Sequence, residues 1–133
     1  MAGRMDDAIT AAEQDRWSEL NYRFHHRMYE LAARPHSLRI VTQLLSLVEP
    51  YSRAFVHGMN AYERVQAEHH GMVTALADRD AGALARLIAC HLRGAKHGLV
   101  EQLASSAQSR DMLDSLRGLT GTARSRTAMR PES

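Results

Sequence analysis

The sequence has 133 residues, of which 44% are hydrophobic and 24% charged, and its formal net charge is +2. This is the length and composition of one globular domain, and the charge is too small to predict nucleic-acid binding. The single cysteine, Cys90, excludes a disulfide scaffold, and no run of about 18 apolar residues is present to span a membrane. Residues 1–7 lack the apolar core of a signal peptide, so we expect a cytoplasmic protein.

Helical periodicity recurs along most of the chain, whereas the β signals are weak. Aromatic residues make up 5% of the sequence, and no Asn-Gly or Asp-Gly hairpin turn occurs. The predicted fold class is therefore all-α, an antiparallel bundle of about four to five helices joined by short loops.

The first predicted helix carries an apolar stripe whose members are three or four residues apart: Trp17, Leu20, Phe24, Met28 and Leu31. It should begin near Met5 or Thr10. We expect it to end near Ala33, because Pro35 disfavours helical geometry in the residue before it.

The second predicted helix is apolar on one face: Leu38, Val41, Leu45 and Val48. Ser37 is its expected N-cap. Pro50 should kink or interrupt this helix near Val48. Gly58 and Asn60 predict the turn that follows.

A third helix is predicted over residues 62–77, with four inward side chains: Tyr62, Val65, Met72 and Leu76. Residues 78–80 form a predicted turn, and Asp80 is a good N-cap for a fourth helix that runs to about Ala104. We therefore divide the chain into a flexible start or helix extension (1–10), a helical bundle (11–104), and a linker, short helix and disordered basic tail (105–133).

Four polar residues fall where the helical period places core side chains. Asn21 and His25 are one turn apart on the first helix, while His69 and His91 lie on the apolar stripes of the third and fourth. Amide and imidazole groups are costly to bury without partners, so we expect the four to meet. An amide oxygen and three imidazoles form a site suited to Zn²⁺, Ni²⁺ or a similar divalent metal, with positions left for water or a small anion.

The alternative is that these histidines are hydrogen-bonded core residues without a metal. The remaining histidines carry weaker signals: His26 and His70 should be on the surface, His36 in a loop, and His57 and His97 on a solvated helix face or a pocket wall. Cys90 is expected to be a small core residue.

The motif Asn21-x-x-Phe24-His25, the pair Glu68-His69 and the 22-residue step from His69 to His91 together resemble the FCD domain. This is the C-terminal effector-binding domain of the FadR subgroup of GntR-type bacterial transcription regulators. The resemblance covers about residues 8–104. It implies a bundle with a central cavity, where a metal on the floor binds the carboxylate of a small organic acid.

Carried over by position, the resemblance implies Asn21, His25, His69 and His91 as metal ligands. Asn21 departs from the aspartate of the best-known metal binders in the family, so the site loses one negative charge and some metal affinity. Family members that bind acyl groups without metal also exist, so a metal-free pocket stays open.

A carboxylate effector needs positively charged or hydrogen-bonding partners. Arg53, close in sequence to Tyr51 and Phe55, is the first candidate, and His57 is a second ligand-binding candidate. A surface arginine without ligand is an equally open interpretation of Arg53. Three other arginines are weaker candidates: Arg23, Arg27 and Arg64.

The resemblance further implies a winged helix-turn-helix before such a domain, and these 133 residues contain none. The bundle would then be N-terminally short, and DNA would be bound only through that missing domain. Residues 62–90 do not replace it, because the helix after their turn offers alanines and glycine, which make no directional base contacts. An open apolar face on a short bundle predicts a homodimer.

The predicted function is therefore effector sensing for a GntR-type transcription regulator. A small metalloenzyme is an alternative, but its only sequence-adjacent base, Glu68, points about 100° away from His69 on a helix. A purely structural or dimerisation bundle is a further alternative. Whether the chain is a fragment or a stand-alone domain stays open.

Overall fold

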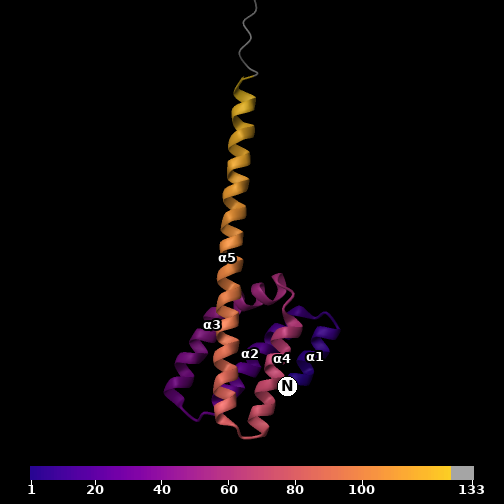
Figure 1. The fold of residues 1–133 in the computed structure, drawn as a ribbon, viewed down its shortest axis with the longest axis vertical. Helices are drawn as coiled ribbons and strands as arrows, with labels where there is room; N and C mark the ends of the chain where they lie inside the picture. Colours follow the sequence, from indigo (N-terminus) through magenta and orange to yellow (C-terminus); the bar gives the residue numbers. More distant parts are fainter. Residues whose placement is uncertain (127–133) are drawn as a thin grey trace, which may run out of the picture. The chain divides into compact units, whose positions relative to one another are not determined.

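The structure, a computed structural model, describes the backbone of residues 1–126 and, within it, the side chains of residues 1–107, 110, 111 and 114. Five helices account for it: α1 (Ala2–Thr10), α2 (Gln14–Glu30), α3 (Pro35–Gly58), α4 (Tyr62–Ala77) and α5 (Ala81–Arg126). The described residues contain no strand, so the predicted all-α class is confirmed (Figure 1). No helix in this part of the chain has the length and hydropathy that a membrane span requires.

The chain divides into two units, and the first unit, residues 1–99, holds the bundle. The backbone of α5 remains helical from Ala81 to Arg126, without the linker expected at residues 105–109. Within that stretch the hydroxyl of Ser106 donates to the carbonyl of Gln102 (2.9 Å), so this small polar side chain is accommodated inside the helix. The last part of the predicted disordered tail, residues 127–133, lies outside the described residues.

The apolar stripe of the predicted first helix lies on α2, and a start of that helix near Met5 is wrong, because residues 2–10 form the separate helix α1. Ala12 adopts a left-handed φ of 55°, and the Glu13 N–H bonds back to the carbonyl of Ala8 (2.9 Å), which closes α1. Met5 and Ala8 are buried, so residues 2–10 form a packed helix rather than a flexible start or an extension of α2.

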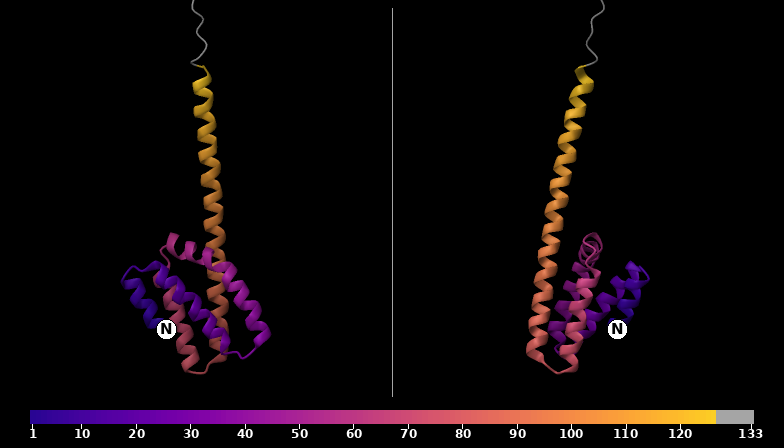
Figure 2. Two further views of the ribbon diagram at one scale, coloured as in Figure 1. Left: turned by 180° about the vertical axis from the view of Figure 1, so that it is seen from behind. Right: turned by 45° about the vertical axis from the view of Figure 1, so that its right-hand side comes forward.

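α3, which is the second predicted helix, starts earlier than expected. Pro35 occupies the first turn of α3, where a missing N–H costs nothing, and Ser37 lies inside the helix instead of capping it. Pro50 lies within a helix that continues to Gly58. The second half of α3 runs in a different direction from the first half, which agrees with the predicted kink (Figure 2).

The predicted third helix and the cap of the fourth are confirmed. α4 spans Tyr62–Ala77, and Asp80 Oδ1 accepts the backbone N–H of Ala83 (2.8 Å) in the first turn of α5. Arg79, with φ 55°, makes the turn between the two helices.

The hydrophobic core lies among α1, α2, α4 and the second half of α3. α2 packs on both α1 and α3, and α4 packs on α1. The fully buried side chains include Met5, Trp17, Met72 and, unusually for a titratable group, His69. The buried residues of the core cluster are Met5, Ala8, Trp17, Leu20, Phe24, Met28, Phe55, Val56, Ala61, Val65 and Met72.

Gly98 of α5 lies directly against the ring of buried Phe55, since a Cβ on Gly98 would come within 2.2 Å of the ring. We expect Gly98→Ala to lower the free energy of unfolding by about 1–3 kcal/mol, because the buried ring must shift within the core to admit the methyl group. Gly71→Ala is the matched control: its Cβ would meet Leu87 at an ordinary 3.7 Å, and the better helix propensity of alanine should make it neutral or stabilising. Urea denaturation of both variants measures the difference, and equal midpoints would contradict the close approach.

Candidate metal centre

Three histidines from three helices meet inside the bundle. His25 of α2, His69 of α4 and His91 of α5 each offer one ligand atom, and these atoms all lie within 4.8 Å of one another. Their ring centroids are 5.1–5.2 Å apart. The prediction that inward-facing histidines of separate helices meet is confirmed.

The cluster is enclosed by core side chains. His25, His69 and His91 are all buried, with His69 at 0% exposure. The ring of Phe24 lies 4.7 Å from that of His69, and Trp17 stacks on His69 from farther away (6.4 Å). These aromatic walls keep water from solvating a charged imidazolium.

This environment keeps two of the imidazoles neutral. Burial, together with repulsion from His91, lowers the pKa of His25 from 6.5 to about 3. Burial and the neighbouring histidines His25 and His91 lower the pKa of His69 from 6.5 to about 2. Only the neutral imidazole has a lone pair for a metal, so at neutral pH these rings are in the ligating form.

Two polar side chains of α4 hold the outer nitrogens of the cluster. His91 Nδ1 is 2.6 Å from Glu68 Oε2. The other oxygen of Glu68 accepts a hydrogen bond from Arg64 Nη1 at 3.0 Å. His69 Nδ1 lies 3.3 Å from Gln66 Oε1. Such outer hydrogen bonds are typical of metal-binding histidines, because they orient the ring and fix its tautomer.

Glu68 corrects the expectation that it points away from the site. Its side chain leaves α4 in a different direction from that of His69, but its carboxylate contacts His91 of α5. Gln66 was not among the predicted site residues. Its spacing of three residues from His69 was the available signal, since it places both on one face of the helix.

Three buried polar atoms at or beside the cluster have no hydrogen-bond partner among the described residues: Asn21 Oδ1, His25 Nδ1 and His69 Nε2. A buried, unpaired polar atom costs about 1–3 kcal/mol. His69 Nε2 is a nitrogen suited to a borderline divalent metal, and such a metal among the three rings would satisfy it. The residues present therefore fit a metal. Asn21 as a fourth ligand stays a prediction.

Two residues are predicted to bind the effector, and both are at the surface. Arg53 and His57 are exposed. The guanidinium of Arg53 pairs with Asp15 (2.6 Å) and with Glu49 (3.1 Å). Among the arginines considered, Arg64 contacts the cluster's outer partner, Glu68.

The other histidines lie outside the cluster. His70 is exposed and pairs with Asp6 (3.0 Å), and His26 stacks on Tyr22 near Glu30. Three further histidines are exposed: His36, His57 and His97. Cys90 is also exposed, so its prediction as a core residue is wrong. Cys90 is next to the inward-facing His91, and one helical step of about 100° turns it outward.

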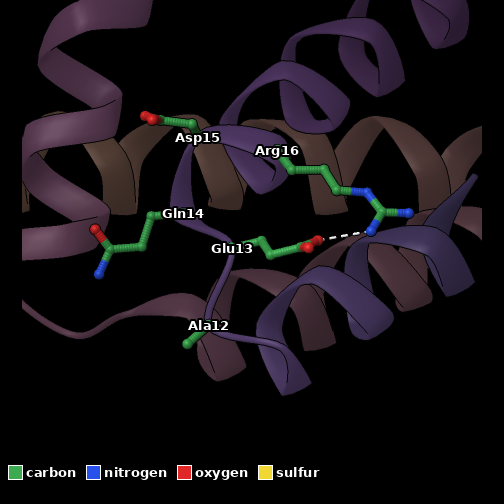
Figure 3. Close-up of a pocket in the computed structure, with 5 residues that line it drawn as sticks. All are labelled: Ala12, Glu13, Gln14, Asp15 and Arg16. Carbon is green, nitrogen blue, oxygen red and sulfur yellow. Dashed lines mark hydrogen bonds and ion pairs between the residues drawn. The ribbon is translucent and has the colours of Figure 1, made fainter.

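Two hollows lie near the turn between α1 and α2. One, of about 530 Å³, is lined by residues 12–16, among which Arg16 and Glu13 form an ion pair of 2.6 Å (Figure 3). The other, of about 260 Å³, has Trp17, Asn60 and Tyr62 among its lining residues. Neither hollow is lined by a histidine of the cluster.

Comparison with known proteins identifies the family. No curated protein and no solved structure matches the chain. The family model of the FCD domain matches residues 1–94, a range that contains all three clustered histidines and both of their outer partners. The match begins with α1, which the resemblance had left largely outside the domain. The chain belongs to the FCD domain family.

Proposed function

We propose that this domain senses a small organic acid through a divalent metal, Zn²⁺ or Ni²⁺, held by His25, His69 and His91 with Asn21 as a fourth ligand. The observation that carries the proposal is the group of three buried imidazoles, whose ligand atoms lie within 4.8 Å of one another. FCD domains are effector-binding regulatory domains of GntR-type regulators, which supports a sensory role.

The charge of the ligand set favours a carboxylate effector. Three neutral imidazoles and an amide oxygen leave the two positive charges of a divalent metal uncompensated within the first layer of ligands. A metal with open positions binds and polarises an anionic oxygen ligand. Binding would shift the populations of bundle conformations, and DNA affinity would change only through an attached or partner reader domain.

The side chains that bind the part of the effector away from the metal stay a prediction. Arg53 and His57 are the candidates from the sequence, and a ligand carboxylate would have to displace Asp15 or Glu49 from Arg53. Arg64 is an alternative cation, because it already contacts Glu68 at the edge of the cluster.

Metal content and thermal melting test the proposal directly. The purified full chain should contain about one metal per chain, and chelation should lower the melting temperature. At a metal concentration a hundredfold above Kd, the stabilisation is about 2.7 kcal/mol. His69→Leu should abolish this metal-dependent shift, whereas His36→Leu, at an exposed position, should retain it. Retention of the shift in His69→Leu would contradict the site.

The same preparation separates sensing from catalysis. A small carboxylic acid that raises the melting temperature of the metal-loaded protein should be recovered unchanged after incubation. Chemical conversion of the acid, followed by chromatography, would favour the metalloenzyme alternative.

We also propose that the domain is a homodimer that pairs through the first half of α3. That half carries exposed apolar residues at helical spacing: Ile40, Leu44, Leu47 and Val48. Exposed Tyr51 follows directly after Pro50. Leu47→Glu should convert the dimer into a monomer in light scattering at micromolar concentration, because it buries a charge in the interface. Val73→Glu, at an exposed valine of α4, is the control and should leave the dimer intact. A well-folded wild-type monomer would refute the dimer.

A further inference from the structure

Gln66 connects the histidine cluster to the first turn of the chain's first helix. Its side chain is buried. Gln66 Nε2 donates to the backbone carbonyl of Ala2 at 3.0 Å, and Gln66 Oε1 lies 3.3 Å from His69 Nδ1. One amide group therefore bridges a ligand histidine of α4 and the start of α1.

The chemistry of this bridge determines which nitrogen of His69 carries the proton. A backbone carbonyl only accepts, so the nitrogen end of the Gln66 amide must face Ala2. The oxygen end then faces His69, and an amide oxygen also only accepts. His69 Nδ1 must therefore be the protonated nitrogen, which leaves the lone pair on Nε2. His69 Nε2 is the nitrogen that is buried without a partner among the described residues.

We propose that Gln66 is a positioning residue, which presents the Nε2 lone pair of His69 to the metal and couples metal binding to the docking of α1. This inference rests on the proposed function, since it assumes a metal at the histidine cluster. Because coupling free energies are reciprocal, metal binding strengthens the docking of α1, and loss of the bond to Ala2 weakens metal binding.

The way α1 is held makes it responsive to this bond. α1 has nine residues, which is too short for a helix to be stable by itself in water. Besides the burial of Met5 and Ala8, it is held on α4 by the Gln66 bond and by the hydrogen bond of His70 Nε2 to Asp6. Gln66 precedes His69 by three residues and His70 follows it directly, so α1 docks on the turn of α4 that carries the ligand.

Two measurements on the full chain test the proposal at pH 8: the Kd for Zn²⁺ in competition with a chromophoric chelator, and hydrogen exchange of the α1 amides with and without Zn²⁺. In the wild type, Zn²⁺ should slow exchange in α1. Gln66→Met has a similar size but no hydrogen bonds, so it should weaken Zn²⁺ binding about 10- to 100-fold. It should also abolish the effect of Zn²⁺ on α1.

Gln66→Glu separates the contact with His69 from the contact with Ala2. Its ionised carboxylate can accept from His69 Nδ1 but cannot donate to the carbonyl of Ala2. We expect its Zn²⁺ affinity to lie between those of Gln66→Met and the wild type, because the contact with His69 is kept and the coupling to α1 is lost, while α1 exchanges equally fast with and without Zn²⁺. If Gln66 only stabilised the fold, Gln66→Glu would not separate the Zn²⁺ affinity from the Zn²⁺-dependent protection of α1. Gln43→Met, at an exposed position of α3, is the matched control and should behave as the wild type.

The outcomes distinguish this inference from the proposed function. Wild-type protein that binds Zn²⁺, together with unchanged affinity and unchanged α1 protection in Gln66→Met, overturns the role of Gln66 alone. Wild-type protein that binds no Zn²⁺ overturns the metal site and the inference with it. If Gln66→Met does not fold, as judged by circular dichroism, Gln66→Glu still decides, because Zn²⁺-dependent protection of α1 in that variant contradicts the coupling.

Discussion

Between about pH 6.5 and pH 4, the metal-free protein should lose stability by about 2.7 kcal/mol for each pH unit of acidification. Two histidines account for this, since burial lowers the pKa of His25 to about 3 and of His69 to about 2. In this range the unfolded chain takes up a proton at each ring, and the folded protein does not. Stability therefore rises with pH by about 1.4 kcal/mol per unit for each group, and it falls when acid is added.

The pH window follows from the same values. Above the unfolded pKa of about 6.5, both states carry neutral rings and these histidines contribute no pH dependence. Below pH 6.5 the loss of stability continues until the pH reaches the folded-state pKa values of about 3 for His25 and about 2 for His69. Urea denaturation of the chelator-treated protein at several pH values gives the slope. His69→Leu should halve it and His36→Leu should not change it, whereas a flat profile above pH 5 would show that the rings are not held neutral.

The histidine cluster could be predicted from the sequence because the helical period alone decides which face a residue occupies. His69 follows Val65 by four residues and precedes Met72 by three, so burial of these apolar neighbours also buries the ring. The capping role of Asp80 is local in the same sense, because its side chain bonds to a backbone N–H only three residues away. Features of this kind depend on nearby residues, and the structure confirms them.

The features that the sequence analysis missed depend on contacts between distant residues. The break between α1 and α2 falls at Ala11 and Ala12, and alanine is the best helix former, so no local signal marks it. α1 turns back because Met5 and Ala8 are buried against the bundle, which is a tertiary effect. The bond of Gln66 to the carbonyl of Ala2, 64 residues away, could not be predicted for the same reason.

Replacing Asn21 by aspartate should change metal binding and metal-free stability in opposite directions. Asn21 Oδ1 is buried without a hydrogen-bond partner among the described residues, and Asn21 lies one helical turn from His25. A carboxylate at this position without a metal is a buried, unpaired charge, so Asn21→Asp should lower the metal-free stability by about 3 kcal/mol. With the metal, the added charge should raise affinity about 100-fold, since opposite charges at contact distance attract by several kcal/mol even when partly screened.

One experiment reads both effects: the chelated protein shows the penalty, and the difference between metal-loaded and chelated protein depends only on Kd. The difference in melting temperature between metal-loaded and chelated protein should therefore be larger for Asn21→Asp than for the wild type, as the gain of about 100-fold in affinity requires. Asn60→Asp makes the same chemical change at an exposed turn position, and it should leave that difference unchanged. If Asn21→Asp also leaves it unchanged, the amide of Asn21 is not a ligand and the metal is held by the three histidines alone. If it lowers metal-free stability without raising affinity, the carboxylate is buried away from the metal, and the charge of the site is set by the imidazoles and the bound acid.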